Sequence, residues 1–408
     1  MQGQQHCLLL LPSPPVPSTQ ASIAAAYNPS IKATILPLKD GLMGTQLTVA
    51  IACPSLHEQL QGPRSKIFGE VQSLLGQLYT LLSLACTELD VDVVSGGAGS
   101  VDARVILLDY DNGTSFSGEP KYVSGTGPIV DLPTFALTRR HWRTIFAVDG
   151  EEGQALLSNY MAIANSTTPA LSCQLETVRG GVSLVEKSPD RTLVPGPTTL
   201  HNIVAVGGTF DHLHAGHKLL LTATALLLQP TSQGSASPSR LIVGITGDEL
   251  LKNKKYAEYM KSWQQRQEDV VDFLVSILSF TCASLDESLQ TSTVSEPTQN
   301  GRAIHTTLLA NSLRIECVEI QDPFGPTITD ESISALVVSA ETRSGGKAVN
   351  DRRAEKGWSV LEIFEVDVLD AEQTDEGATK TENFASKISS TAIRKQQAEN
   401  RSRPLDRM

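Results

Sequence analysis

Residues 202–221 read NIVAVGGTFDHLHAGHKLLL, and the change of pattern within this stretch decides the fold. The small apolar residues before Gly207 and Gly208 show no polar alternation, which is typical of a strand buried on both faces. From about Gly216 to Leu228 the chain becomes rich in leucine and alanine, which favour a helix. We therefore expect a buried strand that ends at the two glycines, followed by a helix that begins among three histidines.

The same alternation continues through the second half of the chain. Further strand candidates stand at RLIVGIT (240–246), RIECVEI (314–320) and ISALVVS (333–339), and residues 262–280 are predicted to form a helix. Apolar strands separated by helices indicate a parallel sheet covered on both faces. The predicted fold class is α/β, with a Rossmann-like domain over residues 201–400 and a tail over 401–408.

The first half of the chain predicts a smaller α/β domain over residues 1–185. The run CLLLLPSPPVP (7–17) predicts a short buried strand, because its apolar part stops at Leu11 and no basic region of a signal peptide precedes it. Apolar residues recur at helical spacing over 65–89. Further strand candidates are residues 45–53, 103–109 and 144–149.

Three polar stretches are expected to connect or interrupt the regular elements. Residues 186–200, EKSPDRTLVPGPTTL, are rich in proline and threonine without an apolar period, so they predict the interdomain linker. Residues 229–239 and 286–301 have low-complexity polar sequence. We expect them to be disordered surface insertions.

Composition excludes several classes of function. The chain has 408 residues and a formal net charge of -12, which disfavours a nucleic-acid or anionic-membrane partner because both require positive potential. The six cysteines include no CxxC pair, so neither a zinc site nor a disulfide framework is predicted. No segment approaches the roughly 20 apolar residues of a membrane span. The expected location is the cytoplasm, with the nucleus as an alternative.

The glycines and histidines after the strand at 203–208 suit a phosphate group. Gly207, Gly208 and Gly216 allow the backbone to approach a ligand closely, and the free N–H groups of a helix N-terminus attract an anion. His214 and His217 are three positions apart, so in a helical turn they share one face. Both would then contact the same anion.

A second stretch near the end of the chain has the same kind of chemistry. KISSTAIR (387–394) places Ser389, Ser390 and Thr391, which are N-cap residue types, at the start of a predicted helix. Arg394 lies one turn further on and supplies a fixed cation. Together with the histidine turn, this stretch predicts a cradle for a triphosphate.

The two stretches resemble the signatures of a known superfamily. HAGH (214–217) and ISSTAIR (388–394) are similar to the HxGH and ISSTxxR motifs of nucleotidyltransferases. With residues 207–221, 243–274 and 320–353, the chain resembles eukaryotic, fungal-type pantetheine-phosphate adenylyltransferases over about residues 200–398. No GxxxxGK[ST] motif occurs, so we expect no dephospho-CoA kinase activity.

The resemblance implies a role for individual residues. His217 would donate to the α-phosphate, His214 would take the first signature position, and Thr209, followed by Phe210, would help to hold the incoming phosphate. The lysine after the second strand would be Lys252, or else Lys254. Further expected contacts to ATP are Arg343 or Lys347, in place of bacterial arginines, and Ser389, Ser390, Thr391 and Arg394. Mg²⁺ would arrive on the ATP phosphates, and no protein metal ligand is expected.

The implied reaction joins ATP to 4'-phosphopantetheine, giving dephospho-CoA and pyrophosphate. An NMN-type adenylyltransferase remains an alternative, because it shares the second signature. A scaffold for other enzymes of coenzyme A synthesis, acting through residues 1–185, is an alternative of a different class. The expected partners are therefore the two small substrates, with pathway enzymes as a further possibility.

Overall fold

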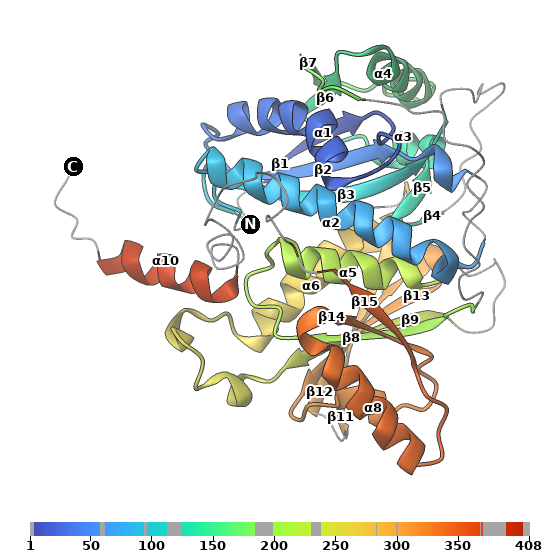
Figure 1. The fold of residues 1–408 in the computed structure, drawn as a ribbon, viewed down its shortest axis with the longest axis vertical. Coiled ribbons are helices and arrows are strands. Elements are labelled where there is room, and N and C mark those ends of the chain that lie inside the picture. Colours follow the sequence, from blue (N-terminus) through green and yellow to red (C-terminus); the bar gives the residue numbers. More distant parts are fainter. Residues whose placement is uncertain are drawn as a thin grey trace.

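The computed structural model describes residues 4–57, 62–93, 96–111, 125–183, 199–229, 238–282, 284–298, 301–367, 369 and 389–402. Within these ranges the chain forms two α/β units, each built on its own sheet (Figure 1). We call residues 4–183 the N-terminal unit and residues 199–402 the C-terminal unit. The predicted linker lies outside the described residues, apart from Thr199 and Leu200.

The N-terminal unit contains a parallel sheet with the strand order β5-β3-β2-β1-β6-β7. Its central strands are nearly continuous apolar runs, as expected for a sheet covered on both faces. The predicted strands and the long helix of this half are confirmed. The strands are β1 (Gln5–Leu11), β2 (Thr45–Ala52), β3 (Val101–Asp109), β5 (Ile129–Asp131), β6 (Thr144–Val148) and β7 (Gln174–Val178), and the helices are α1 (Gln20–Ile35), α2 (Arg64–Glu88), α3 (Leu132–Thr138) and α4 (Glu151–Ala164).

The C-terminal unit contains a sheet with the order β11-β12-β13-β9-β8-β14-β15. The strands from β13 to β15 are parallel, which confirms the predicted Rossmann-type domain. The strands are β8 (Ile203–Gly208), β9 (Ser239–Thr246), β11 (Leu289–Thr298), β12 (Gly301–Leu308), β13 (Leu313–Ile320), β14 (Ala335–Ser339) and β15 (Glu362–Val366). The helices are α5 (Ala215–Leu227), α6 (Trp263–Leu278), α7 (Leu285–Ser288), α8 (Arg343–Glu355) and α10 (Ser390–Ser402).

The prediction of a disordered insertion at residues 286–301 is wrong. β11 occupies most of this stretch and pairs antiparallel with β12, which in turn pairs antiparallel with β13. Threonine, serine and valine alternate along β11, and such residues favour a strand once a neighbouring strand offers hydrogen-bond partners. Of the other predicted insertion, residues 230–237 lie outside the described part of the chain.

The strand order changes direction at β8. The chain crosses from β8 to β9 on one side of β8, whereas β14 pairs with its other side. At such a point the connections leave in opposite directions and open a crevice beyond the carboxyl ends of the strands. The histidine turn follows β8 directly, so it lies at this crevice.

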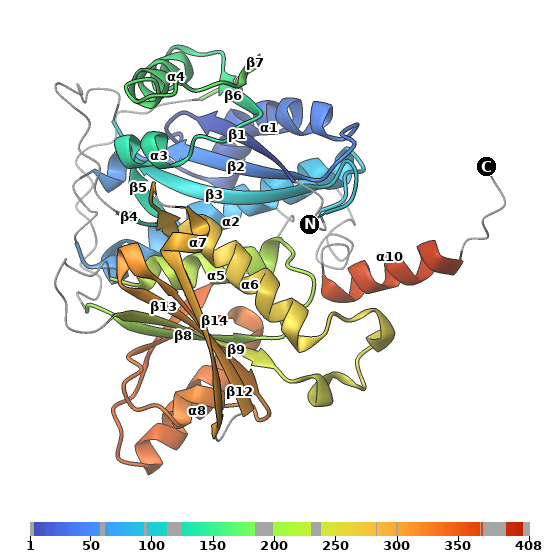
Figure 2. The ribbon, with the colours of Figure 1, turned by 180° about the vertical axis from the view of Figure 1, so that it is seen from behind.

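The two units are packed against each other along α5. Figures 1 and 2 show α2 on one side of α5 and the strands β8 and β14 on the other. α6 contacts β3, and the short strand β4 (Gly125–Thr126) pairs antiparallel with β10 (Ser279–Phe280) across the two units. α5 is therefore covered by protein on two sides.

Two expectations drawn from composition can be compared with the structure. All six cysteines are free thiols, as the absence of a disulfide pattern predicts. Among the helices of the described residues, none combines the length and the apolar character needed to traverse a membrane.

Candidate active site

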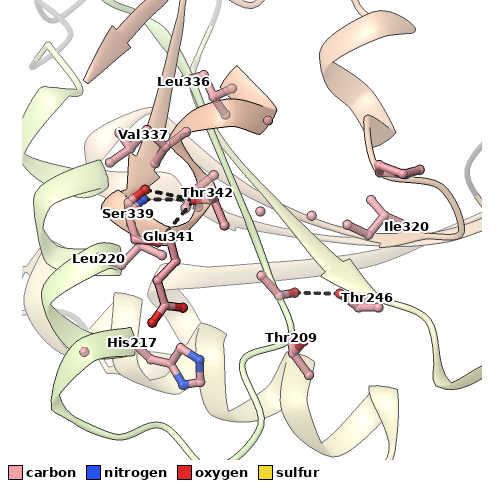
Figure 3. Close-up of a pocket in the computed structure, with 18 of the residues that line it drawn as sticks. Thr209, His217, Leu220, Thr246, Ile320, Leu336, Val337, Ser339, Glu341 and Thr342 are labelled. Atoms are coloured by element: carbon pink, nitrogen blue, oxygen red, sulfur yellow. Dashed lines mark hydrogen bonds between the residues drawn. The ribbon is translucent and has the colours of Figure 1, made fainter. Parts of the chain in front are cut away.

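A large pocket opens beyond the carboxyl ends of β8, β9, β13 and β14. Its volume is about 930 Å³, and it is lined by residues of both predicted signatures. Figure 3 shows Thr209 and His217 on one side of it, with Glu341 and Thr342 approaching from the end of β14. The crevice at the reversal of strand order is thus a real cavity.

Of the predicted site residues, most line this pocket and a few do not. The residues that line it are Gly207, Gly208, Thr209, His214, Gly216, His217, Lys254, Ser389, Ser390, Thr391 and Arg394. The residues that are absent from its lining are Phe210, Lys252 and Arg343. Chain segments almost 180 residues apart therefore supply one cavity.

The two signature histidines lie in the first turn of α5 and face each other. His214 is the N-cap residue, and its ring stacks on the ring of His217 with 3.9 Å between centroids. The ring of Phe210 lies 5.4 Å from that of His217. Nδ1 of each signature histidine is buried without a hydrogen-bond partner among the described residues. The stacked rings confirm the expectation that His214 and His217 lie on one face of the turn.

Both histidines are neutral at physiological pH. Burial lowers the pKa of His217 to about 4, although the charge of Asp211 acts to raise it. Burial also holds the pKa of His214 well below its usual value, and the nearby His217 and Lys218 act in the same direction. A neutral imidazole has one N–H donor and one acceptor nitrogen. Neither ring therefore needs to take up a proton before it donates its single N–H, which in His217 is also hydrogen-bonded to the backbone of His212.

Two glycines of the turn lie close to aromatic rings, so a side chain in their place would press on those rings. A Cβ on Gly216 would lie 3.2 Å from the His214 ring, and a Cβ on Gly208 would lie 3.0 Å from the Phe210 ring. Phe210 is fully buried and has a φ of 51°, so it supports the turn from the core. The expected ligand contact of Phe210 is thus replaced by packing behind Gly208 and His217.

Arg266 joins three segments that border the pocket. Its guanidinium is fully buried and donates to the carbonyl oxygens of Thr209 at 2.6 Å and Thr246 at 2.8 Å. It also pairs with Asp248 at 2.6 Å. A capping box of Ser262 and Gln265 begins the same helix. These contacts give Arg266 a positioning role, because its donors are directed at the protein backbone.

The second signature is attached to the first through Asp211, which the sequence reasoning missed. Ser390 Oγ donates to the Asp211 carbonyl at 2.6 Å, and Arg394 Nη1 donates to the Asp211 carboxylate at 2.6 Å. Arg394 also donates to Lys255 O and to Thr391 Oγ1. Ser389 Oγ accepts from the backbone of Ala392, as predicted for an N-cap residue type.

Of the three cationic residues Lys252, Lys254 and Arg343 that were expected near the triphosphate, one lines the pocket and two do not. Lys252 lies outside the pocket, with its side chain 65% exposed and 2.5 Å from Glu249. Lys254, two residues on, lines the pocket. Arg343 begins α8, pairs with Glu365 and is absent from the cavity lining. Lys254 is the lysine that the geometry favours.

An acidic side chain in the pocket was also missed. Glu341 follows β14, and Figure 3 shows its side chain directed into the cavity on the side of His217. Its carboxylate accepts hydrogen bonds and attracts cations, in contrast to the cationic side chains of Lys254 and Arg394 in the same lining. Within the described ranges, no group of three or more His, Cys, Asp or Glu residues is arranged to hold a metal ion.

Comparisons with known proteins agree with this geometry. Residues 205–396 match the family model described as cytidylyltransferase-like, and residues 1–184 match a domain of unknown function. These matches support a nucleotidyltransferase. The chain belongs to the cytidylyltransferase-like family, and its relatives include phosphopantetheine adenylyltransferases.

Three relatives show how the similarity is distributed. An uncharacterized protein of Schizosaccharomyces pombe, C1F12.08, is 30% identical over 359 residues, which are 87% of each chain. The phosphopantetheine adenylyltransferase of Saccharomyces cerevisiae is 35% identical over 201 residues, or 49% of this chain and 50% of the relative. The enzyme of that name from Pyrococcus abyssi is 30% identical over 191 residues, or 47% of this chain and 87% of the relative.

Proposed function

We propose that the chain transfers the adenylyl group of ATP to 4'-phosphopantetheine, releasing pyrophosphate and forming dephospho-CoA. The observation that carries the proposal is the meeting of the two signatures in one pocket, fixed by the contacts of Ser390 and Arg394 with Asp211. The names of the yeast and archaeal relatives support the choice of acceptor.

The proposed chemistry needs no residue that removes a proton from the acceptor. A phosphate monoester has a second pKa near ~6, so the acceptor is largely a dianion at neutral pH. One of its oxygens attacks the α-phosphorus, a new P–O bond forms, and the bond to the β-phosphate oxygen breaks. The electron pair of that bond leaves with pyrophosphate. The protein has to hold two polyanions in line and stabilise the charge that develops.

The pocket residues suit this task. The neutral His217 side chain would donate to the α-phosphate, and His214 would support the same group from its stacked position. Thr209 would hold the incoming phosphate. The free N–H groups at the start of α10, with Ser389 and Thr391, would receive the leaving pyrophosphate. We propose that ATP enters with Mg²⁺ on its phosphates, as part of the substrate.

Pyrophosphate release from ATP by the purified full chain tests the proposal. The acceptors 4'-phosphopantetheine and NMN are supplied in separate reactions, and the products are identified by mass. We expect release with 4'-phosphopantetheine, yielding dephospho-CoA that the chain does not phosphorylate further. Release only with NMN would show that NMN, and not 4'-phosphopantetheine, is the acceptor. No release with either acceptor would contradict adenylyl transfer as the function.

A further inference from the structure

The helix that carries the histidine pair has an unusual environment for a helix of an α/β unit. The sequence of α5, AGHKLLLTATALL, is apolar on every face after its first turn, and Leu219, Leu221 and Leu226 are all at most 1% exposed. A helix with apolar residues all round is stable only when it is covered on all sides. Here the sheet of the C-terminal unit covers one side, and α2 covers the other.

Lys218 is the one charged residue of α5, and its partner belongs to the N-terminal unit. Lys218 is 5% exposed, and its Nζ lies 2.5 Å from Asp102 Oδ1 on β3. The other oxygen of that carboxylate lies 2.7 Å from Arg104 Nη1, and Arg104 Nε donates to Ser276 Oγ of α6 at 2.7 Å. Asp102 thus links two buried cations and both units.

The Asp102 carboxylate stays ionised in this buried position. Burial acts to raise its pKa, but the charges of Arg104 and Lys218 outweigh burial and lower the pKa to about 2. Removing the negative charge would leave two buried cations facing each other without a counter-charge. The carboxylate is therefore required where it is.

The contact lies directly behind the signature turn. Lys218 follows His217, and its backbone N–H donates to His214 O at 3.0 Å, one of the first hydrogen bonds of the helix. One turn further on, the Tyr79 hydroxyl of α2 lies 3.2 Å from Thr222 Oγ1, which donates to Lys218 O at 2.7 Å. The N-terminal unit thus binds two successive turns on one face of α5.

The position of the imidazoles depends on the position of this helix. The two rings stack on each other, and neither Nδ1 has a hydrogen-bond partner within the described ranges. The His217 ring also hydrogen-bonds to the backbone of His212, which belongs to the same turn. A shift of the first turn of α5 would therefore move the His217 donor by the same amount. Displacements of about 1 Å can cost a rate on the order of 10²-fold.

We infer that Asp102 is a positioning residue for adenylyl transfer, and that the N-terminal unit acts on the reaction by holding α5 through Asp102 and Tyr79. This inference rests on the proposed function. It gives residues 1–184, which match a domain of unknown function, a role in setting the donor geometry of a pocket whose lining comes from the C-terminal unit among the described residues.

The first test measures kcat and KM of the full chain carrying Asp102→Asn. Rates are divided by the fraction of molecules that bind ATP, so that a loss of folded protein does not count as a loss of rate. We expect kcat to fall on the order of tenfold or more while KM for ATP changes little, because only the transition-state contact is misplaced. An unchanged kcat per binding site would overturn the inference.

Three further variants separate positioning from general damage at the interface. Asp102→Asn combined with Lys218→Met removes one unpaired cation and should recover part of the lost kcat. Tyr79→Phe removes only the hydroxyl and keeps the ring, so it can be measured even where Asp102→Asn fails to fold. We expect it to lower kcat by about threefold. Ser65→Ala removes the contact of α2 with Thr199 O and should leave kcat unchanged. Equal losses in Ser65→Ala and Tyr79→Phe would contradict the inference.

A readout without turnover distinguishes failure of this inference from failure of the proposed function. If the unaltered chain releases no pyrophosphate, the proposed function fails, and the side-chain NMR resonance of His217, assigned with His217→Asn, decides on positioning. We expect Asp102→Asn and Tyr79→Phe to shift that resonance and Ser65→Ala to leave it in place. If all three variants leave the resonance unchanged, the N-terminal unit does not determine the position of the His217 ring.

Discussion

His217 is the residue on which the proposed chemistry depends most directly. Its buried, neutral ring lines the pocket at the start of α5. Replacement by alanine should lower kcat by a factor on the order of 10² or more, as for the loss of one preorganised donor. Steady-state pyrophosphate release measures this. His57→Ala, at a half-exposed histidine of the N-terminal unit, is the control, and a rate for His217→Ala equal to that control would remove His217 from the mechanism.

The lowered histidine pKa values make stability depend on pH. Burial lowers the pKa of five histidines below the value of 6.5 that they regain on unfolding: His6, His201, His214, His217 and His305. The unfolded chain therefore takes up more protons below pH 6.5. The contribution of these five side chains to the unfolding free energy is therefore fully present above pH 6.5 and is lost as the pH falls below it, for His217 down to its pKa of about 4.

Urea unfolding at pH 7 and pH 4.5 measures that dependence. The loss of unfolding free energy between the two pH values should be smaller in His217→Asn than in the unaltered chain, by on the order of 2 kcal/mol. The reason is that the pKa of His217 falls from 6.5 in the unfolded chain to about 4 in the folded chain, and this one shift accounts for that difference. Identical losses in both proteins would mean that the ring is not buried in the neutral form.

The two neighbouring lysines should differ in kinetics. Lys254 lines the pocket, whereas Lys252 is exposed and pairs with Glu249. Lys254→Ala should lower kcat/KM for ATP by about tenfold, because a cation near a triphosphate is lost, and Lys252→Ala should stay within about twofold. A larger loss of kcat/KM in Lys252→Ala than in Lys254→Ala would show that Lys252, the residue favoured by the sequence, contacts ATP. Sequence spacing could not separate them, because the loop conformation decides which ammonium reaches the cavity.

At the scale of elements, α10 is attached to the rest of the C-terminal unit by a buried charge pair of Arg394 with Asp211, together with backbone contacts. Asp211 is fully buried and binds both Ser390 and Arg394 of this helix. Asp211→Asn leaves the Arg394 guanidinium buried beside a neutral group, so α10 should detach more often. We expect faster amide exchange over residues 389–402 and a rise of about tenfold in KM for ATP.

The same helix provides a matched control for that variant. Lys395 and Glu399 form an exposed pair 3.7 Å apart on α10, and Lys395→Ala should change neither the amide exchange nor KM. Equal exchange in Asp211→Asn and the unaltered chain would show that other contacts hold the helix.

Regular elements were predictable where the apolar pattern alone determines them. β8, α5 and α6 follow from long apolar or periodic runs, and the capping box before α6 follows from Ser262 and Gln265. β11 was not predictable in that way, because its polar residues form a strand only beside β12. Asp102 and Lys218 are 116 positions apart, so their contact depends on how two units pack, which no local pattern contains.

At the scale of the whole molecule, the interface should make the two units unfold together. It includes the Asp102 ion pairs, the strand pair β4 and β10, and an edge-to-face contact of Phe68 with Phe364 at 5.0 Å. Separating the units would expose an apolar helix and leave buried charges unpaired. Scanning calorimetry should show one transition with equal calorimetric and van't Hoff enthalpies. Two resolved transitions would show that the units are independently stable.

The covering of α5 by α2 also affects biosynthesis. Tyr79 and its contact Thr222 are 143 positions apart, so the surface of α2 that receives α5 leaves the ribosome long before α5 does. At ordinary elongation rates the delay is on the order of ten seconds. During that time the nascent chain displays an apolar surface with the ion pair of Asp102 and Arg104 beside it. Until the downstream helix α5 is synthesised, the apolar surface of α2 that it covers in the folded protein therefore has no partner and is prone to aggregation.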